Sequence, residues 1–312
     1  MGARLRHYPE GASEGSAGVQ AAETGERPAR VAPALFPFTS RWVEVEGASL
    51  HYVDEGEGPA LLMIPGTPMW SFMYRRTILA LRDEFRCIAV DLPGLGLSEA
   101  PLFQGEAYRR SAGWLQSFVR TLDLRKFILA VHATAGPPAL EMAVRERGRV
   151  RALVVTNSFA WPFEQLRLRF FARLISSSFA GFLNVRFNLL PQITARLGRR
   201  GGSFTSEEKA AILGPFRGKA ARRHLQNYAY GLRAEREMFG ELAERLAVFR
   251  RAPTLLLYGA HDNGYKAGLL ERWKRLLPSH KVVLLRESFH FPPEDEPERY
   301  AAELKGWARS VR

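Results

Sequence analysis

The chain has 312 residues, of which 46% are hydrophobic and 25% are charged, with a formal net charge of +13. This balance is ordinary for a soluble globular protein, and no run reaches the roughly 20 apolar residues that a membrane-spanning helix needs. Cys87 is the single cysteine, which excludes intramolecular disulfides and suits a reducing compartment. We therefore expect a cytoplasmic protein.

Residues 1–33 are rich in Gly, Ala, Ser, Glu and Pro and lack the apolar segment of a secretory signal, which predicts a disordered N-terminal tail. Residues 41–46 and 49–54 follow a period of two, which predicts a β-hairpin. Continuous apolar runs, typical of buried parallel strands, then span residues 60–64, 85–90, 127–131, 150–155, 254–258 and 282–285.

Helical periodicity separates most of these runs, at residues 70–81, 107–122, 138–145, 268–277 and 297–308. Alternating strands and helices predict an α/β fold with a mostly parallel sheet flanked by helices. Residues 159–252 show helical periodicity without a clear strand, so we expect a helical cap inserted between two parts of a core, residues 34–158 and 253–312. Such a cap would cover the carboxyl edge of the sheet, where ligands bind in these folds.

The sequence VHATAGPP, residues 131–138, joins a predicted strand to a predicted helix through a turn of small residues. A strand, a sharp turn and a helix are typical of a nucleophile elbow, whose apex residue carries the attacking atom. The strand register places Ala133 at the apex, and a methyl group cannot attack. Thr134 loosely matches G-x-S-x-G, but a β-branched residue tolerates the positive φ of an elbow badly.

Two more loops follow the last predicted strands, and they contain Asp262 and His290. The chain order elbow, acid, histidine is that of α/β-hydrolases. Because both residues lie just after a strand, the fold can bring them together at one edge of the sheet. The sequence therefore predicts that Asp262 orients His290.

From about residue 36 to its end, the chain resembles the haloalkane dehalogenase branch of the α/β-hydrolase superfamily. The resemblance is carried by residues 37–59 (PFTSRWVEVEGASLHYVDEGEGP), by residues 65–101, by VTNSFAWP at 155–162 and by FHFPPEDEPER at 289–299. It implies a reaction in which an elbow aspartate displaces halide from carbon and a histidine, oriented by a second acid, activates water to hydrolyse the resulting ester. An asparagine and a tryptophan hold the leaving halide.

Carried over residue by residue, the resemblance makes Asp262 the orienting acid and His290 the histidine. The nucleophilic aspartate falls on Ala133, and the two halide ligands fall on Thr67 and Thr134, so all three are replaced. The backbone N–H groups of Thr67 and Thr134 are still expected to form an oxyanion hole. The residues expected to bind substrate are Met69, Trp70 and Trp161.

These replacements leave three hypotheses. The one we favour is an acid–base enzyme without a covalent intermediate, in which His290 and Asp262 promote lyase, isomerase or decarboxylase chemistry, or direct water attack, on a hydrophobic substrate. The second is a dehalogenase or esterase-type hydrolase inactivated at Ala133. The third is a non-catalytic binding protein that kept the cleft. None of them calls for a cofactor or a metal.

The excess positive charge is concentrated in the predicted cap, where residues 161–252 contain 17 Lys and Arg against 7 Asp and Glu. A solvated basic face is the simplest interpretation, and the alternative is docking of an acidic protein or an anionic membrane surface. No nucleic-acid-binding motif is present, so we expect no nucleic-acid partner. The sequence leaves the oligomeric state open.

Overall fold

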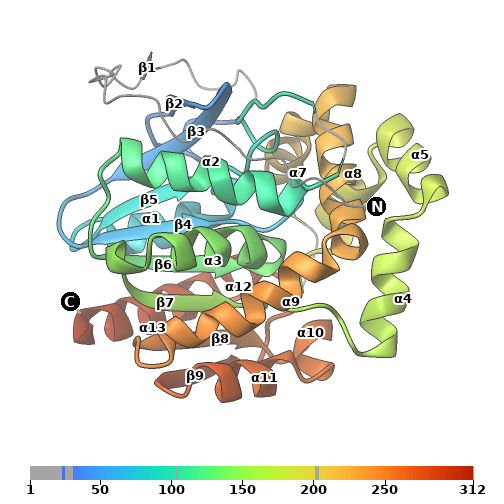
Figure 1. The fold of residues 1–312 in the computed structure, drawn as a ribbon. Coiled ribbons are helices and arrows are strands. Elements are labelled where there is room, and N and C mark those ends of the chain that lie inside the picture. The colour runs from blue at the N-terminus through green and yellow to red at the C-terminus, as the bar shows by residue number, and fades with distance from the viewer. Residues whose placement is uncertain (1–22, 25–30, 103–104, 201–203, 312) are drawn as a thin grey trace, which may run out of the picture.

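The structure is a computed structural model that describes residues 23–24, 31–102, 105–200 and 204–311. The predicted tail, residues 1–33, therefore lies almost wholly outside the described residues. Figure 1 shows one twisted sheet with helices on both faces and a group of helices extending beyond one end of the sheet. Within the described part of the chain, no helix is both long enough and apolar enough to cross a membrane.

The sheet has the order β1-β2-β3-β5-β4-β6-β7-β8-β9. Its strands are β1 (Glu23–Thr24), β2 (Arg41–Val45), β3 (Ala48–Glu55), β4 (Ala60–Ile64), β5 (Arg86–Val90), β6 (Phe127–His132), β7 (Val150–Thr156), β8 (Thr254–Gly259) and β9 (His280–Leu285). The β2–β3 hairpin and the β3–β5 pair are antiparallel, and all pairs from β5 to β9 are parallel. The mostly parallel α/β sheet predicted from the apolar runs is confirmed.

The helices of the core flank this sheet in two layers. They are α1 (Arg75–Leu81), α2 (Ala107–Thr121), α3 (Gly136–Arg145), α10 (Asn263–Lys266), α11 (Leu269–Leu276), α12 (Pro292–Asp295) and α13 (Pro297–Ser310). Figure 1 shows α2 and α3 in front of the sheet and α1, α12 and α13 behind it. Both faces of the sheet are thereby covered, as a parallel sheet requires.

Alternating side chains along the central strands build a separate apolar core on each face of the sheet. On β6, Leu129 belongs to the core beneath α2 and α3, whereas its neighbour Ile128 belongs to the core beneath α1 and α13. Both side chains are essentially inaccessible to solvent. Each such burial stabilises the fold by about 1.5–3 kcal/mol. The two cores fix the strands, and the strands fix the positions of the loops at their carboxyl ends.

Between β7 and β8 the described residues form helices only. These are α4 (Leu166–Ile175), α5 (Ser178–Phe187), α6 (Leu189–Leu197), α7 (Ser206–Leu213), α8 (Lys219–Ala234) and α9 (Arg236–Arg245), with short 3₁₀ turns after α7 and α9. We call this helical segment the cap. In Figure 1, α4 and α5 lie at the right-hand edge of the molecule, farther out than α8 and α9.

Candidate active site

The turn between β6 and α3 has the backbone of an elbow. Ala133 lies at its apex with a φ of 46°, in the left-handed region that non-glycine residues seldom adopt. The Ser158 hydroxyl donates to the Ala133 carbonyl at 2.6 Å and helps to hold this conformation. The apex is where the strand register predicts it, and the side chain that it presents is a methyl group.

The loop after β4 packs directly against this elbow. Gly66 has no room for a side chain, because a Cβ there would lie 2.7 Å from the Ala133 Cβ and 2.6 Å from the His132 carbonyl oxygen. This close approach brings the next residue, Thr67, to Thr134. We call Thr67, Ala133 and Thr134 the elbow half of the site.

The two threonines of the elbow half bind each other. The Thr67 N–H donates to Thr134 Oγ1 at 2.8 Å, and the two hydroxyl oxygens are 3.0 Å apart. The structure thus brings together both residues of the predicted oxyanion hole. It also shows that the Thr67 N–H already has an acceptor, so a substrate oxygen would have to displace the Thr134 hydroxyl to reach it.

Asp262 and His290 form the other half of the site, which we call the acid–histidine half. His290 Nδ1 lies 2.7 Å from Asp262 Oδ2. Burial alone would raise the pKa of Asp262, but hydrogen bonds from His290, Tyr265 and Gly264 hold it below its usual value. A carboxylate can only accept, so Nδ1 carries the proton of this bond, and in the neutral imidazole Nε2 is the nitrogen with the lone pair. The His290 side chain is 44% exposed, which suits a proton acceptor that must reach a ligand.

Asn157 ties together the loops that carry these residues. Its Nδ2 donates to the carbonyl oxygens of Phe289 and His290 at 3.0 and 3.1 Å, and its Oδ1 accepts the Gly259 N–H at 3.0 Å. Asn157 has a φ of 43°, which asparagine tolerates better than most residues. Its role was not predicted from the sequence. An asparagine directly after a buried strand was the available signal.

His132, at the end of β6, binds the backbone of the loop that carries His290. Its Nε2 lies 2.7 Å from the His290 carbonyl oxygen, which can only accept, so Nε2 carries the proton. Burial lowers the pKa of His132 to about 3, so the ring is neutral. His132 is therefore a positioning residue for His290.

The three residues expected to bind substrate are buried. The Trp70 indole N–H donates to the Ala211 carbonyl of α7 at 3.1 Å. Trp161 packs against Trp273, with ring centroids 4.8 Å apart. Met69 is 1% exposed. Trp70 thus links the loop after β4 to the cap, and substrate contact for all three stays a prediction.

A Ser–His–Asp arrangement lies elsewhere in the core. His51 Nδ1 is 2.9 Å from Asp91 Oδ2, and His51 Nε2 is 3.0 Å from Ser40 Oγ. All three residues are 1% exposed or less. Asp91 also accepts the N–H groups of Ser71 and Leu97. Because no substrate can reach it, this arrangement is structural.

Metal chemistry has no obvious site in the part of the chain that the structure describes. No group of three or more His, Cys, Asp or Glu side chains is arranged there to hold a metal ion. Asp262 and His290 bind each other, and Asp262 also accepts the backbone N–H groups of Gly264 and Tyr265.

Comparison with known proteins agrees with this geometry. The family model described as the alpha/beta hydrolase fold matches residues 59–297, and the chain belongs to that family. Within it the chain lies in the haloalkane dehalogenase-like branch. It is 34% identical over 278 residues to haloalkane dehalogenase 2 of Mycobacterium tuberculosis. The matched region covers 87% of this chain and 96% of the relative.

Other relatives and solved structures extend the comparison. The chain is 26% identical over 281 residues to the cis-3-alkyl-4-alkyloxetan-2-one decarboxylase of Shewanella oneidensis, covering 87% of this chain and 88% of that protein. The haloalkane dehalogenase DatA from Agrobacterium tumefaciens C58 has a TM-score of 0.79 at 19% identity, covering 88% of this chain and 97% of that one. At this identity the structural likeness shows the fold alone.

Proposed function

We propose that this chain is an acid–base enzyme acting on a hydrophobic substrate, with His290 as the proton acceptor and no covalent enzyme intermediate. The observation that carries the proposal is the contrast between a complete Asp262–His290 pair, 2.7 Å apart, and a methyl group at the elbow apex. The pair can move a proton. The apex has no atom with which to form an ester.

The hydrogen bonding of His290 determines which of its two nitrogens can accept a proton. With Nδ1–H bound to Asp262, Nε2 is the basic nitrogen, and the buried carboxylate stabilises the imidazolium that forms when Nε2 accepts a proton. In direct water attack, Nε2 takes one proton from the water molecule while the water oxygen forms a bond to the substrate carbon. When the bond between that carbon and its leaving oxygen breaks, the imidazolium gives the proton to the departing oxygen, so that the histidine ends neutral.

The relatives support a class of substrate. One is named as a decarboxylase of oxetanones that carry two alkyl chains, and others are named haloalkane dehalogenases. Both names describe small electrophiles with apolar groups. We therefore place dialkyl oxetanones, alkyl esters and haloalkanes first among the compounds to be tried, with oxetanones preferred because the relief of ring strain favours attack of the activated water on their carbonyl carbon.

The test is turnover of these compounds by the native chain and by His290→Gln. We expect turnover of at least one carbonyl compound, a loss of about 100-fold or more in kcat for His290→Gln, and no covalent adduct in the intact-protein mass during turnover. An adduct, or a His290→Gln variant as active as the native chain, would overturn the proposal. His280→Gln, a half-exposed histidine on β9, serves as the matched control and is expected to keep full activity.

A non-catalytic binding role is the second candidate, and one observation favours it. The Thr67 N–H is already donated to Thr134, so the elbow half is satisfied without a substrate. A binding protein would bind apolar ligands as well after His290→Gln as before it, and would turn over none of them.

A further inference from the structure

The outer helices of the cap, α4 and α5, present an unusual number of large apolar side chains to solvent. On α4 only Leu168 and Ala172 are buried. The exposed apolar residues of the two helices are Leu166, Phe170, Phe171, Leu174, Phe179, Phe182 and Phe187, with exposed fractions between 52% and 79%. We call this set the apolar rim. So many large exposed apolar side chains on two neighbouring helices indicate an interaction surface rather than ordinary surface composition.

The segment that contains α4 and α5 has many basic side chains and no acidic ones. Residues 165–206 contain seven arginines and no Asp or Glu. Arg167, Arg169 and Arg173 lie on α4 among the exposed apolar residues, and no described residue forms an ion pair with any of the three. The arginines of α4 therefore add positive charge to the apolar rim, and no ion pair among the described residues compensates it.

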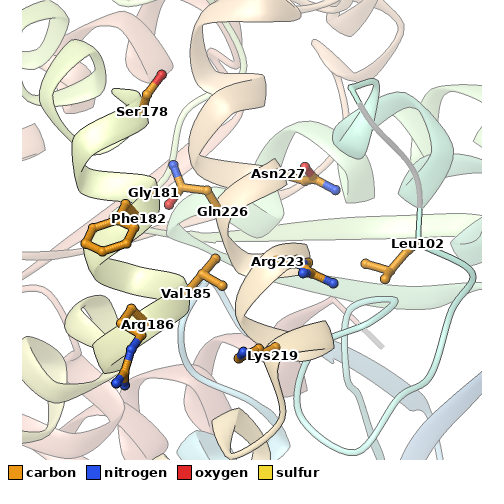
Figure 2. Close-up of a pocket in the computed structure, with 10 residues that line it drawn as sticks. All are labelled: Leu102, Ser178, Gly181, Phe182, Val185, Arg186, Lys219, Arg223, Gln226 and Asn227. Atoms are coloured by element: carbon orange, nitrogen blue, oxygen red, sulfur yellow. The ribbon is translucent and has the colours of Figure 1, made fainter.

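A pocket of about 830 Å³ opens beside the apolar rim, between α5, α8 and the loop at Leu102 (Figure 2). Arg186 of α5 and Lys219 and Arg223 of α8 line it together with apolar groups such as Val185. Figure 2 shows Arg223 and Leu102 extending toward one another across it. No ion pair to the three cations is found among the described residues. Cations beside apolar walls suit a ligand that joins an anionic group to a hydrocarbon chain.

We propose that the apolar rim docks onto an anionic lipid bilayer, with the pocket beside it taking one anionic headgroup. Helices that carry Phe and Leu among Arg lie in the interface of a membrane, because the rings enter the acyl boundary while the guanidinium groups extend to the headgroups. A second copy of this chain fits less well, since a symmetric contact would place arginines against arginines. Membrane docking would deliver an apolar substrate to the cap, although it does not depend on the proposed reaction.

The experiment is co-flotation of the native chain with vesicles of phosphatidylcholine alone and of phosphatidylcholine with about one third phosphatidylserine. We expect binding to the anionic vesicles only, with a decrease of about tenfold or more in affinity when salt shortens the range of charge interactions. Replacing Arg167, Arg169 and Arg173 by Glu should abolish the binding. A second variant, Phe170→Ser with Phe179→Ser, should weaken it about tenfold without changing the charge.

The matched control carries the same change of charge elsewhere: Arg151→Glu, Arg275→Glu and Arg286→Glu are on exposed positions of the core and should preserve binding. Equal binding by the α4 charge variant, equal loss in the core control, or no binding of the native chain to anionic vesicles would each overturn the proposal. So would a dimer in solution that the α4 variant dissociates while vesicle binding is absent. Circular dichroism establishes that each variant is folded.

Discussion

The acid–histidine half and the elbow half of the site lie at the same edge of the sheet and differ in where their polar groups point. In the acid–histidine half, Asp262 accepts hydrogen bonds from Gly264, Tyr265 and the Nδ1–H of His290. These bonds orient the His290 ring and leave Nε2 as its second nitrogen. In the elbow half, Thr67 and Thr134 bind each other. Under the function proposed above, a ligand would meet a proton acceptor on one side and a closed pair of hydroxyl groups on the other.

The backbone of the elbow half is nevertheless that of a working elbow. An alanine in the left-handed region costs roughly 1–2 kcal/mol, and Ala133 remains there under the Ser158 hydrogen bond and the close contact with Gly66. The strain thus belongs to the way β6 turns into α3. It persists without a nucleophile, so the shape of the elbow and its chemistry are separable properties of this fold.

The largest effect that we expect concerns the buried charges beneath the acid–histidine half. Arg75 of α1 donates to Glu208 of α7 at 2.7 Å and to Glu294 of α12, four residues after His290. Arg75→Met would leave two buried carboxylates without this cation, and we expect the free energy of unfolding to fall by about 3–5 kcal/mol. Urea denaturation measures it.

Arg76 is the matched control for Arg75. It donates to Glu208 at 3.2 Å, but its side chain is 35% exposed. Because solvent screens such a pair, Arg76→Met should cost about 1 kcal/mol or less. Equal losses for the two variants would show that the buried network does not hold the cap and the His290 loop together.

The next effect is a dependence of stability on pH that arises from His132. Burial lowers its pKa to about 3 from a model-peptide value of 6.5. Between these two pH values, His132 is protonated in the unfolded chain and neutral in the folded chain. Stability is therefore lost as the pH falls from 6.5 toward 3. His132→Gln keeps an N–H for the His290 carbonyl and does not titrate. Between about pH 7.5 and about pH 5.5, the native chain should lose about 1 kcal/mol more than this variant.

Urea denaturation at the two pH values gives this difference directly. An NMR titration of the His132 ring identifies the group, since its signals should not move over this range in the folded chain. If both chains lose the same stability, His132 is protonated in the folded state and its assignment as a neutral support of His290 is wrong.

A smaller effect separates the two threonines of the elbow half. Thr134 Oγ1 accepts the Thr67 N–H and also bonds the Thr67 hydroxyl, whereas Thr67 Oγ1 makes only the second of these bonds. Thr134→Val should therefore cost about 1 kcal/mol and Thr67→Val about half as much. Thermal unfolding of the pair measures the order. The reverse order would mean that the Thr67 N–H is not satisfied by Thr134.

The parts of this molecule that could be predicted from sequence are those fixed by local patterns. The run at residues 60–64 coincides with β4, and the run at 127–131 is β6 without its last residue. The meeting of Asp262 and His290 followed from their places after strands. The register also gave Ala133 as the apex, because an elbow is a local turn.

The remainder depends on contacts between distant residues. Arg75 meets Glu208 and Glu294, which are 133 and 219 residues away, and no local pattern indicates such partners. Asn157 acts through a backbone conformation and through bonds to residues more than 100 positions away. The hydrogen bond between Thr67 and Thr134 was also not predicted. The spacing of the two residues does not indicate that the Thr134 hydroxyl will accept the N–H group that was expected to bind a substrate oxygen.

The smallest effect that we expect is the most decisive for function. Ala133→Asp restores a carboxylate at an apex whose left-handed backbone aspartate accepts readily, and we expect little or no halide release from haloalkanes. The reason is that two threonine hydroxyls, already bound to each other, stabilise a leaving halide poorly. The comparison is a triple variant, Ala133→Asp with Thr67→Asn and Thr134→Trp, which follows the resemblance to haloalkane dehalogenases and should release more halide than the single variant. Fast release by the single variant would show that the elbow half lacks only its carboxylate, and the chain would then be a dehalogenase disabled at one position rather than the acid–base enzyme proposed here.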